Sequence, residues 1–312
     1  MTEHDIAIIG GGGAGLTAAV YAARARRRTV VFERAVTGGQ ISTTGAVENF
    51  PGFPAGIDGF DLAQAFLQQA EKFGTAIAYE DITSLSVEPD GRFRLDSAES
   101  GIHIARAVIV AAGARYNPLG VPGETELLGR GVSYCATCDG AFFKGQEVAV
   151  IGGGDSAIDE GLFLTRFASK VHVIHRRGQL RASALLQDRA FANPKMTFAW
   201  NTVVERIEGK AQVEAVALRD LETGATIVLP VGGVFIFVGQ TPNNALLQGL
   251  VELDATGHAV VDLNMRTTIP GLFVAGDLRT GAARQLVSAC GDGATAAIAA
   301  ERYLEQAPAA AG

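Results

Sequence analysis

Short apolar runs that end in glycine-rich turns alternate with amphipathic stretches along this chain. Residues 5–9 (DIAII) have the pattern of a buried strand, a glycine-rich turn follows at once, and the stretch LTAAVYAARAR has helical spacing. The same order returns at residues 147–151 (EVAVI), which precede a second glycine turn and the stretch IDEGLFLTRFA. The chain is therefore predicted to contain one strand, turn and helix unit twice.

The remaining pattern predicts further strands and helices. An amphipathic stretch at residues 60–73 is typical of a surface helix, and an Ala-rich stretch from near Gly291 predicts a long C-terminal helix. Strands are expected at residues 29–32, 84–87, 93–95, 107–111, 170–174, 234–238 and 271–275, with a meander of strands over residues 203–229.

Two turn-rich segments, residues 113–120 (GARYNPLG) and 239–244 (GQTPNN), bracket the second unit. A chain of 312 residues is long enough for two domains with separate cores. The C-terminal stretch is too short to fold alone, so we attach it to the first unit. We predict an α/β protein with two Rossmann-like domains, one of residues 1–115 with 245–312 and an inserted one of residues 116–244.

Composition narrows the class of protein. The net charge of -7 and pI near 5.3 argue against nucleic acid as a partner, because a phosphate backbone needs a basic surface. No apolar run reaches the about 18 residues that a membrane-spanning helix needs, and the start MTEHD is too charged for a signal peptide. With only three cysteines, the chain is expected to be cytoplasmic.

The first turn, GGGGAG at residues 10–15, has the spacing of a dinucleotide-binding loop. In such a loop Gly10 permits the tight turn, Gly12 lets backbone approach a pyrophosphate, and Gly15 lets the helix pack on the strand. Glu33 ends the next strand, where a carboxylate can accept hydrogen bonds from both ribose hydroxyls and would repel a 2′-phosphate. The first unit is predicted to bind FAD or NAD(H).

The second turn, GGGDSA at residues 152–157, precedes a strand that leads into HRRGQLR at residues 175–181. Guanidinium groups pair with phosphate, so this unit is predicted to select the 2′-phosphate of NADPH. The alanine at the third glycine position is an accepted variant. The predicted contacts are Gly152, Gly154, Asp155, Ser156, Ala157, His175, Arg176, Arg177 and Arg181.

Two dinucleotide sites in one chain suggest hydride transfer between a nicotinamide and a flavin. The stretch TTIPGLFVAGD ends in Gly276 and Asp277, and this carboxylate could accept hydrogen bonds from a ribityl chain. Arg284 and Gln285 then precede a helix start, whose positive end would stabilise negative charge on a reduced flavin.

Cys135 and Cys138 lie in SYCATCDG, residues 133–140. A zinc site would need further Cys or His ligands at close spacing, and neither Cys290 nor the five histidines form a paired motif, so no metal is expected. A structural disulfide that closes so short a loop would stabilise the fold little, because it removes little entropy from the unfolded chain. Reversible dithiol chemistry is expected instead, with Asp139 placed to hold and deliver a proton as general acid or base.

Together these motifs resemble the low-molecular-weight thioredoxin reductases over essentially the whole chain. The matching segments are GGGGAG, GGQISTT, VENFPG, GRGVSYCATCDGAFF, GGGDSA, HRRGQLR and AGDLRTGAARQ. The resemblance implies a homodimer with an FAD domain and an inserted NADPH domain that carries the redox pair. It implies electron flow from NADPH through FAD and the two cysteines to oxidised thioredoxin.

The resemblance also implies roles for single residues. Cys138 would be the flavin-facing sulfur, and Cys135 would attack the partner's disulfide. Thioredoxin would dock at Arg130, Phe142 and Phe143. FAD contacts are implied at Glu33, Gly39, Gln40, Asn49, Asp277, Arg284 and Gln285.

Two other functions stay open. The chain could reduce another small redox protein or a low-molecular-weight disulfide, since Ala141 replaces an aromatic residue of some family members. A flavin-bound redox sensor would signal without efficient turnover, but has no need to select NADPH. Because the dithiol and NADPH must both reach one flavin from the same inserted domain, we also predict that this domain rotates about residues 113–120 and 239–244.

Overall fold

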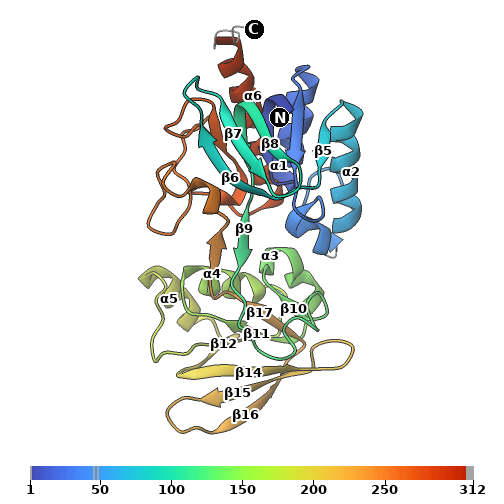
Figure 1. Cartoon of the computed structure of the whole chain (residues 1–312). Coiled ribbons are helices and arrows are strands. Elements are labelled where there is room, and N and C mark those ends of the chain that lie inside the picture. The colour runs from blue at the N-terminus through green and yellow to red at the C-terminus, as the bar shows by residue number, and fades with distance from the viewer. Residues whose placement is uncertain (1, 45, 48, 307–312) are drawn as a thin grey trace. The chain divides into compact units, whose positions relative to one another are not determined.

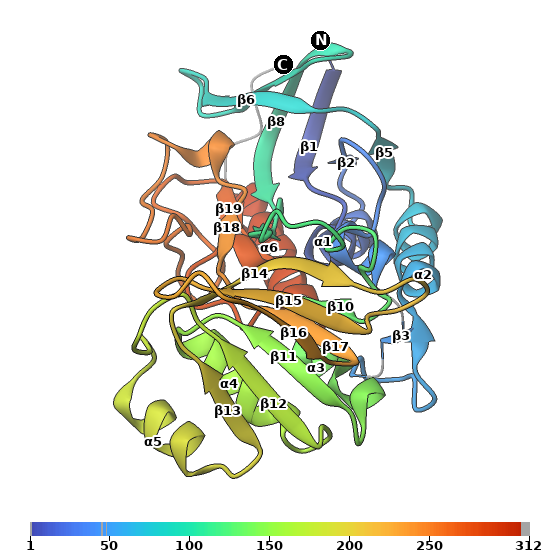
Figure 2. The ribbon, with the colours of Figure 1, turned by 90° about the horizontal axis from the view of Figure 1, so that it is seen from below.

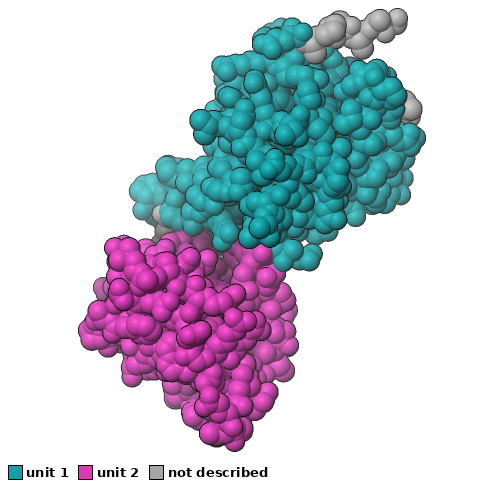
Figure 3. Space-filling model, turned by 90° about the vertical axis from the view of Figure 1, so that its left-hand side faces the viewer, with its two compact units in different colours: residues 1–115, 241–312 teal, residues 116–240 magenta. Residues whose placement is uncertain are grey.

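The computed structural model describes residues 2–44, 46–47 and 49–306. The chain divides into two compact units, unit 1 of residues 1–115 with 241–312 and unit 2 of residues 116–240 (Figure 3). The chain passes between the units twice, and the two crossing strands, β9 (Ala114–Tyr116) and β18 (Gln240–Pro242), pair with each other (Figure 1). The second crossing lies slightly before the boundary predicted after residue 244.

Unit 1 is built on a mixed sheet around β1. Its order is β5 (Ala76–Ala78), β2 (Thr29–Phe32), β1 (Thr2–Ile9), β8 (Gly101–Val110), β7 (Phe93–Ser97) and β6 (Ile82–Val87), with β19 (Leu272–Val274) also on β8. β1 runs parallel to β2 and β8, whereas β7 runs antiparallel to β8. Residues 6–9 are all buried, as a strand with neighbours on both sides and covered faces requires.

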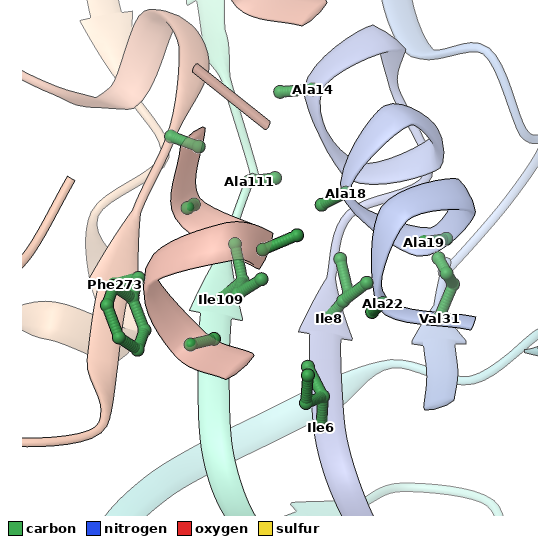
Figure 4. Packing of buried hydrophobic residues seen from close by; sticks show 14 of the residues in the cluster. Ile6, Ile8, Ala14, Ala18, Ala19, Ala22, Val31, Ile109, Ala111 and Phe273 are labelled. Carbon is green, nitrogen blue, oxygen red and sulfur yellow. The ribbon is translucent and has the colours of Figure 1, made fainter. Parts of the chain in front are cut away.

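The helices α1 (Gly13–Arg24) and α6 (Leu286–Gln306) share a core with the sheet of unit 1. Small residues such as Ala14 and Ala18 on α1 let the helices approach each other closely, above Ile8 and Ile109 of the sheet (Figure 4). The α6 helix begins before Gly291, where the sequence placed its start, and Gly293 lies inside it. A Cβ at Gly293 would overlap the Ala14 carbonyl oxygen, so packing against α1 requires this glycine.

The remaining elements of unit 1 are one further helix and several short segments. The helix α2 (Gly59–Lys72) begins after Asp58, whose side chain accepts hydrogen bonds from the Phe60 and Asp61 amides. The short elements are η1 (Gly39–Thr43), β3 (Ala46–Val47), β4 (Ile57–Asp58), η3 (Ala245–Leu247) and η4 (Gly276–Leu278).

Unit 2 has a parallel sheet in the order β10 (Val132–Ser133), β17 (Gly233–Ile236), β11 (Glu147–Ile151), β12 (Lys170–Ile174) and β13 (Met196–Ala199). The helices are α3 (Ala136–Asp139), α4 (Asp155–Leu164) and α5 (Ala184–Ala192), with η2 (Gly140–Phe143) directly after α3. Both units thus have parallel strands joined through helices, which confirms the predicted α/β class.

A second, antiparallel sheet covers the other face of the parallel sheet in unit 2 (Figure 2). It consists of β14 (Thr202–Glu208), β15 (Ala215–Asp220) and β16 (Thr226–Pro230), which is the meander that the sequence predicted. The helix α5 and the strand β13 were not predicted. α5 buries only Ala190 among its residues, so its sequence lacks a clear apolar face.

Candidate active site

The first glycine turn has the backbone that a dinucleotide loop requires. Gly10 has a φ of +105°, and a Cβ there would lie 2.5 Å from the Ala111 carbonyl oxygen. A Cβ at Gly15 would overlap the Gly10 carbonyl oxygen, whereas a Cβ at Gly12 would meet no atom within 4 Å. Gly12 is also the N-cap residue of α1, and as a glycine it has no side chain that could accept a hydrogen bond from the first amides of the helix. Open space therefore lies beside the unpaired amides of a helix start, where an anionic group is stabilised.

Glu33 is held at this turn by backbone. One carboxylate oxygen accepts a hydrogen bond from the Gly11 amide at 2.9 Å, and the other accepts from the Ala35 amide at 3.1 Å. Each carboxylate oxygen can accept more than one hydrogen bond. The side chain is therefore fixed in place and still able to accept the hydroxyls of a ribose.

Gly39, one of the residues predicted from the sequence, lies beside the first glycine turn, and Gln40 follows it. The Gly38 amide donates to the Gly11 carbonyl at 2.7 Å, and a Cβ at Gly39 would lie 3.4 Å from the Gly12 Cα. Gln40 donates from Nε2 to the Ala114 carbonyl at 2.5 Å.

Asn49 and Gln285 are far apart in sequence but adjacent in the structure, since Asn49 Nδ2 donates to Gln285 Oε1 at 3.1 Å. Arg284, directly before Gln285, is exposed and has a φ of +56°.

Asp277 lies in η4, directly after Gly276 and between β19 and α6. Burial raises the pKa of this carboxyl, and Arg284 opposes that rise. A partly buried carboxylate that gains hydrogen-bond donors from a ligand recovers part of its lost hydration, so the position of Asp277 suits a polar ligand.

An ion pair that the sequence analysis missed holds the η4 turn. Asp292 on α6 accepts hydrogen bonds from Arg279 Nε at 2.7 Å and Nη2 at 2.9 Å. The same carboxylate accepts from the Gly276 amide at 3.2 Å. Asp292 is buried, so this bidentate pair fixes the backbone beside Asp277. No local sequence pattern links two residues on separate elements in this way.

The second glycine turn repeats the geometry of the first. Gly152 has a φ of +150°, and a Cβ there would lie 2.5 Å from the Phe237 carbonyl oxygen. Gly154 is the N-cap of α4 and, like Gly12, has no atom within 4 Å of a potential Cβ. Ala157 is fully buried at the third position. Asp155 accepts a hydrogen bond from the Ser183 amide at 2.6 Å, while the neighbouring Ser156 is exposed.

The basic loop after β12 is tied to this turn. The Arg181 amide donates to the Gly153 carbonyl at 2.6 Å, and the side chains of Arg176, Arg177 and Arg181 are exposed. The loop is therefore held beside the open helix start with three cations at its surface.

His175 is the buried member of the same loop. A Cβ at Gly153 would overlap its ring, so the imidazole packs directly on the glycine turn. Burial lowers its pKa, as do Arg181 and Arg177, while a hydrogen bond with the Gln179 backbone opposes the shift. Among the residues that the structure describes, no partner reaches its buried Nε2. An unpaired buried nitrogen at a phosphate-type turn fits a site completed by a ligand.

Cys135 and Cys138 form a disulfide, with Cα atoms 5.3 Å apart. Cys135 is the N-cap of α3, and the Cys138 amide donates to Cys135 Sγ at 3.2 Å. Ser133 Oγ accepts from the Cys135 amide at 3.0 Å and donates to Asp139 Oδ2 at 2.6 Å. Burial raises the pKa of Asp139, although the Ser133 hydrogen bond lowers it. Asp139 can therefore carry a proton closer to neutral pH than an exposed aspartate can.

A second carboxyl group beside the disulfide was not predicted. Glu160 on α4 accepts a hydrogen bond from the Ala136 amide at 3.1 Å, at the first residue of α3. Burial raises its pKa. The only hint in the sequence is that α4 opens the second dinucleotide unit, and nothing local indicates that it packs against the cysteine pair.

The docking residues implied by the resemblance differ in exposure. Phe142 is half exposed, and Arg130 is exposed and donates to the Glu126 carbonyl. The expectation for Phe143 is wrong, because this ring is buried and packs edge-on against Phe235 with ring centres 5.1 Å apart. Phe143 belongs to the core beneath the cysteine pair.

Within residues 2–44, 46–47 and 49–306, no group of three or more His, Cys, Asp or Glu side chains is arranged to hold a metal. No helix in these ranges is both long enough and apolar enough to cross a membrane.

The fold and the site define a class of protein. Two dinucleotide-type turns and a disulfide across two intervening residues are the parts of a disulfide oxidoreductase that uses a flavin and a pyridine nucleotide. The chain belongs to the pyridine nucleotide-disulphide oxidoreductase family, whose model matches residues 4–311.

Its relatives agree with the sequence resemblance. Proteins named thioredoxin reductase from Listeria innocua and Bacillus subtilis are both 48% identical over 97% of this chain, and the matches cover 94% and 95% of those proteins. The solved thioredoxin reductase of Streptococcus pyogenes has a TM-score of 0.92 at 44% identity, over 98% of this chain and 99% of that one. The thioredoxin reductase of Giardia duodenalis has the same TM-score at 36% identity, over 98% and 100%. The resemblance to the thioredoxin reductases is therefore confirmed.

Proposed function

We propose that this protein is an NADPH-dependent thioredoxin reductase, which passes electrons from NADPH through FAD and the Cys135–Cys138 pair to oxidised thioredoxin. The observation that carries the proposal is the disulfide at the start of α3, with Asp139 joined to it through Ser133, on the unit that also bears the arginine loop. The names of relatives that match nearly the whole chain support the same activity.

We assign FAD to unit 1. The open space at Gly12 suits a pyrophosphate, and Glu33 would accept the adenosine ribose hydroxyls. Asp277 would accept hydrogen bonds from the ribityl chain, which would relieve its desolvation. The bound flavin would supply two-electron transfer between nicotinamide and disulfide. Further contacts are proposed at Gly10, Gly15, Gly39, Gln40, Asn49, Gly276, Arg284 and Gln285.

We assign NADPH to unit 2. The pyrophosphate would lie over the amides that follow Gly154, and the exposed guanidinium groups of the arginine loop would pair with the 2′-phosphate. No described residue bonds to Nε2 of His175, which supports a ligand at this turn. The remaining contacts are proposed at Gly152, Asp155, Ser156, Ala157, Arg176, Arg177 and Arg181.

The cysteine pair would carry out thiol–disulfide exchange. In the reduced pair, the Cys135 thiolate attacks one sulfur of the partner disulfide, which forms a mixed disulfide and expels the other partner sulfur as a thiolate. The Cys138 thiolate then attacks Cys135 Sγ, releases the reduced partner and restores the Cys135–Cys138 bond. Asp139 would donate a proton to a leaving thiolate and recover it later.

The pair and the arginine loop both lie in unit 2, which two crossing segments join to unit 1. If both must reach one flavin face, they must do so in turn, so we propose rotation of unit 2 about these crossings. A cross-link that locks the two units should permit at most one half-reaction. Full turnover in the locked enzyme would contradict the rotation.

We further propose a cytoplasmic homodimer, from the sparse cysteines and the family resemblance. Purified protein should be yellow, bleach on addition of NADPH, and reduce thioredoxin faster than glutathione-type or bacillithiol-type disulfides. Preference for a small disulfide would favour the alternative reductase. Bleaching by NADPH with no disulfide reduced would instead support a redox sensor.

A further inference from the structure

The amides at the start of α3 are divided between a sulfur and a carboxylate. The Cys138 amide donates to Cys135 Sγ at 3.2 Å. The Ala136 amide donates to Glu160 Oε2 at 3.1 Å, and the Thr137 amide also bonds to Glu160. Glu160 therefore binds the amides of the two residues that separate Cys135 from Cys138.

Glu160 reaches this position because α3 packs against α4. A Cβ at Gly140, directly after α3, would lie 3.0 Å from Leu164, the last residue of α4. Glu160 and Thr137 also line a cavity of about 740 Å³ in unit 2. Burial raises the pKa of Glu160 and the nearby Asp159 adds to this, while the two backbone hydrogen bonds lower it. The carboxyl group is thus partly withdrawn from water, and its charge is less screened than on the surface.

We propose that Glu160 is a positioning residue of the redox pair, whose negative charge at the start of α3 disfavours the Cys135 thiolate and makes the dithiol a stronger reductant. This inference rests on the proposed function of the pair. A backbone amide that donates to a sulfur favours the thiolate, and a carboxylate on the neighbouring amides opposes that effect through its negative charge. A dithiol whose reduced form is less stabilised gives up its electrons more readily.

The size of the effect follows from the interaction between two partly exposed charges. Such an interaction is worth about 0.4–1 kcal/mol, which corresponds to a change of about 2-fold to 5-fold in the thiolate fraction. Glu160→Gln removes the charge and keeps an oxygen that can accept the same amide hydrogen bonds. If Glu160 had only a structural role, Glu160→Gln would leave the reactivity of Cys135 unchanged.

The test uses the reduced holoenzyme. Alkylation of Cys135 by iodoacetamide is measured between pH 6 and pH 9, with tandem mass spectrometry to separate Cys135 from Cys138. We expect Glu160→Gln to raise the rate at neutral pH about 2-fold to 5-fold and to shift the profile to lower pH. Glutathione redox buffers should show that the variant pair is reduced more easily than the wild-type pair.

Asp159→Asn is the matched control, because this exposed neighbour lines the same cavity and its substitution removes the same charge. It should change the rate less than Glu160→Gln does. Equal profiles for wild type and Glu160→Gln, or equal shifts in both variants, would overturn the proposal. If Glu160→Gln fails to fold, Glu160→Asp tests the same point, since the shorter side chain withdraws from the amides and should raise the rate. An unchanged rate would then refute it.

The proposed function and the role of Glu160 fail in different measurements. If wild-type enzyme does not reduce thioredoxin, the proposed function is wrong, whatever the alkylation profile of Glu160→Gln. Active wild-type enzyme with an unchanged profile in the variant would reject only the role of Glu160.

Discussion

Gly12→Ala separates the binding of the flavin from the folding of unit 1. Gly12 has a φ of -78° and a ψ of -171°, which alanine also adopts, and the new Cβ would meet no protein atom within 4 Å. The residue is the N-cap of α1, where replacing glycine by alanine costs about 1 kcal/mol or less. We therefore expect flavin-free Gly12→Ala protein to melt close to flavin-free wild type.

The effect on the flavin should be much larger. The added methyl group occupies the open space where the proposed pyrophosphate would approach the α1 amides. Forcing a methyl group into a filled contact costs about 1–3 kcal/mol, so flavin affinity should fall about 5-fold to 150-fold. The measurement is a titration of flavin-free protein with FAD, followed by quenching of flavin fluorescence, beside a thermal melt without FAD.

Two glycines serve as controls. A Cβ at Gly15 would overlap the Gly10 carbonyl oxygen, so Gly15→Ala should lower the melting temperature with or without flavin. Gly154→Ala makes the same change at the equally open second turn. It should leave flavin affinity unchanged and raise the KM for NADPH. Wild-type flavin affinity in Gly12→Ala would refute the placement of the pyrophosphate over this turn.

Three further variants test the two cofactor assignments and the dithiol. Replacing Arg176 and Arg177 together by glutamine should raise the KM for NADPH at least about 10-fold more than the KM for NADH. The reason is that the loss of charge-assisted pairing to the 2′-phosphate costs about 1.4 kcal/mol or more. Equal effects on the two KM values would contradict the 2′-phosphate assignment. Cys138→Ser should leave a flavin that NADPH bleaches but abolish thioredoxin reduction, and surviving reduction would contradict the dithiol mechanism. Burial raises the pKa of Asp277 in the folded state above the unfolded value of 3.8. Its contribution to stability is therefore present below pH 3.8 and is lost as the pH rises through the folded-state pKa. Asp277→Asn should raise the melting temperature of flavin-free protein at pH 7 but not at pH 3, and should weaken FAD binding. An unchanged melting temperature at pH 7 would contradict the destabilising burial of this carboxylate.

The sequence alone determined the parts of the protein that depend on local pattern. Residues 29–32, 147–151 and 170–174 form strands with the predicted bounds, because short runs rich in β-branched apolar residues are recognisable without their neighbours. The two glycine turns, the cysteine pair and Asp139 were found in the same way, since each carries its geometry or chemistry within a few residues. Family membership followed from these motifs and their order.

Only the tertiary structure decided what depends on contacts between separate elements. Glu160 reaches the α3 amides because α4 packs beside the cysteine pair, and Asp292 meets Arg279 because α6 crosses the η4 turn. Gly293 lies inside α6 because the close contact with α1 leaves no room for a side chain. Phe143 is buried in the core of unit 2. A carboxylate or an aromatic ring has the same sequence signal whether it lies on the surface or against a partner. Its surroundings, and therefore its role, exist only once the chain has folded.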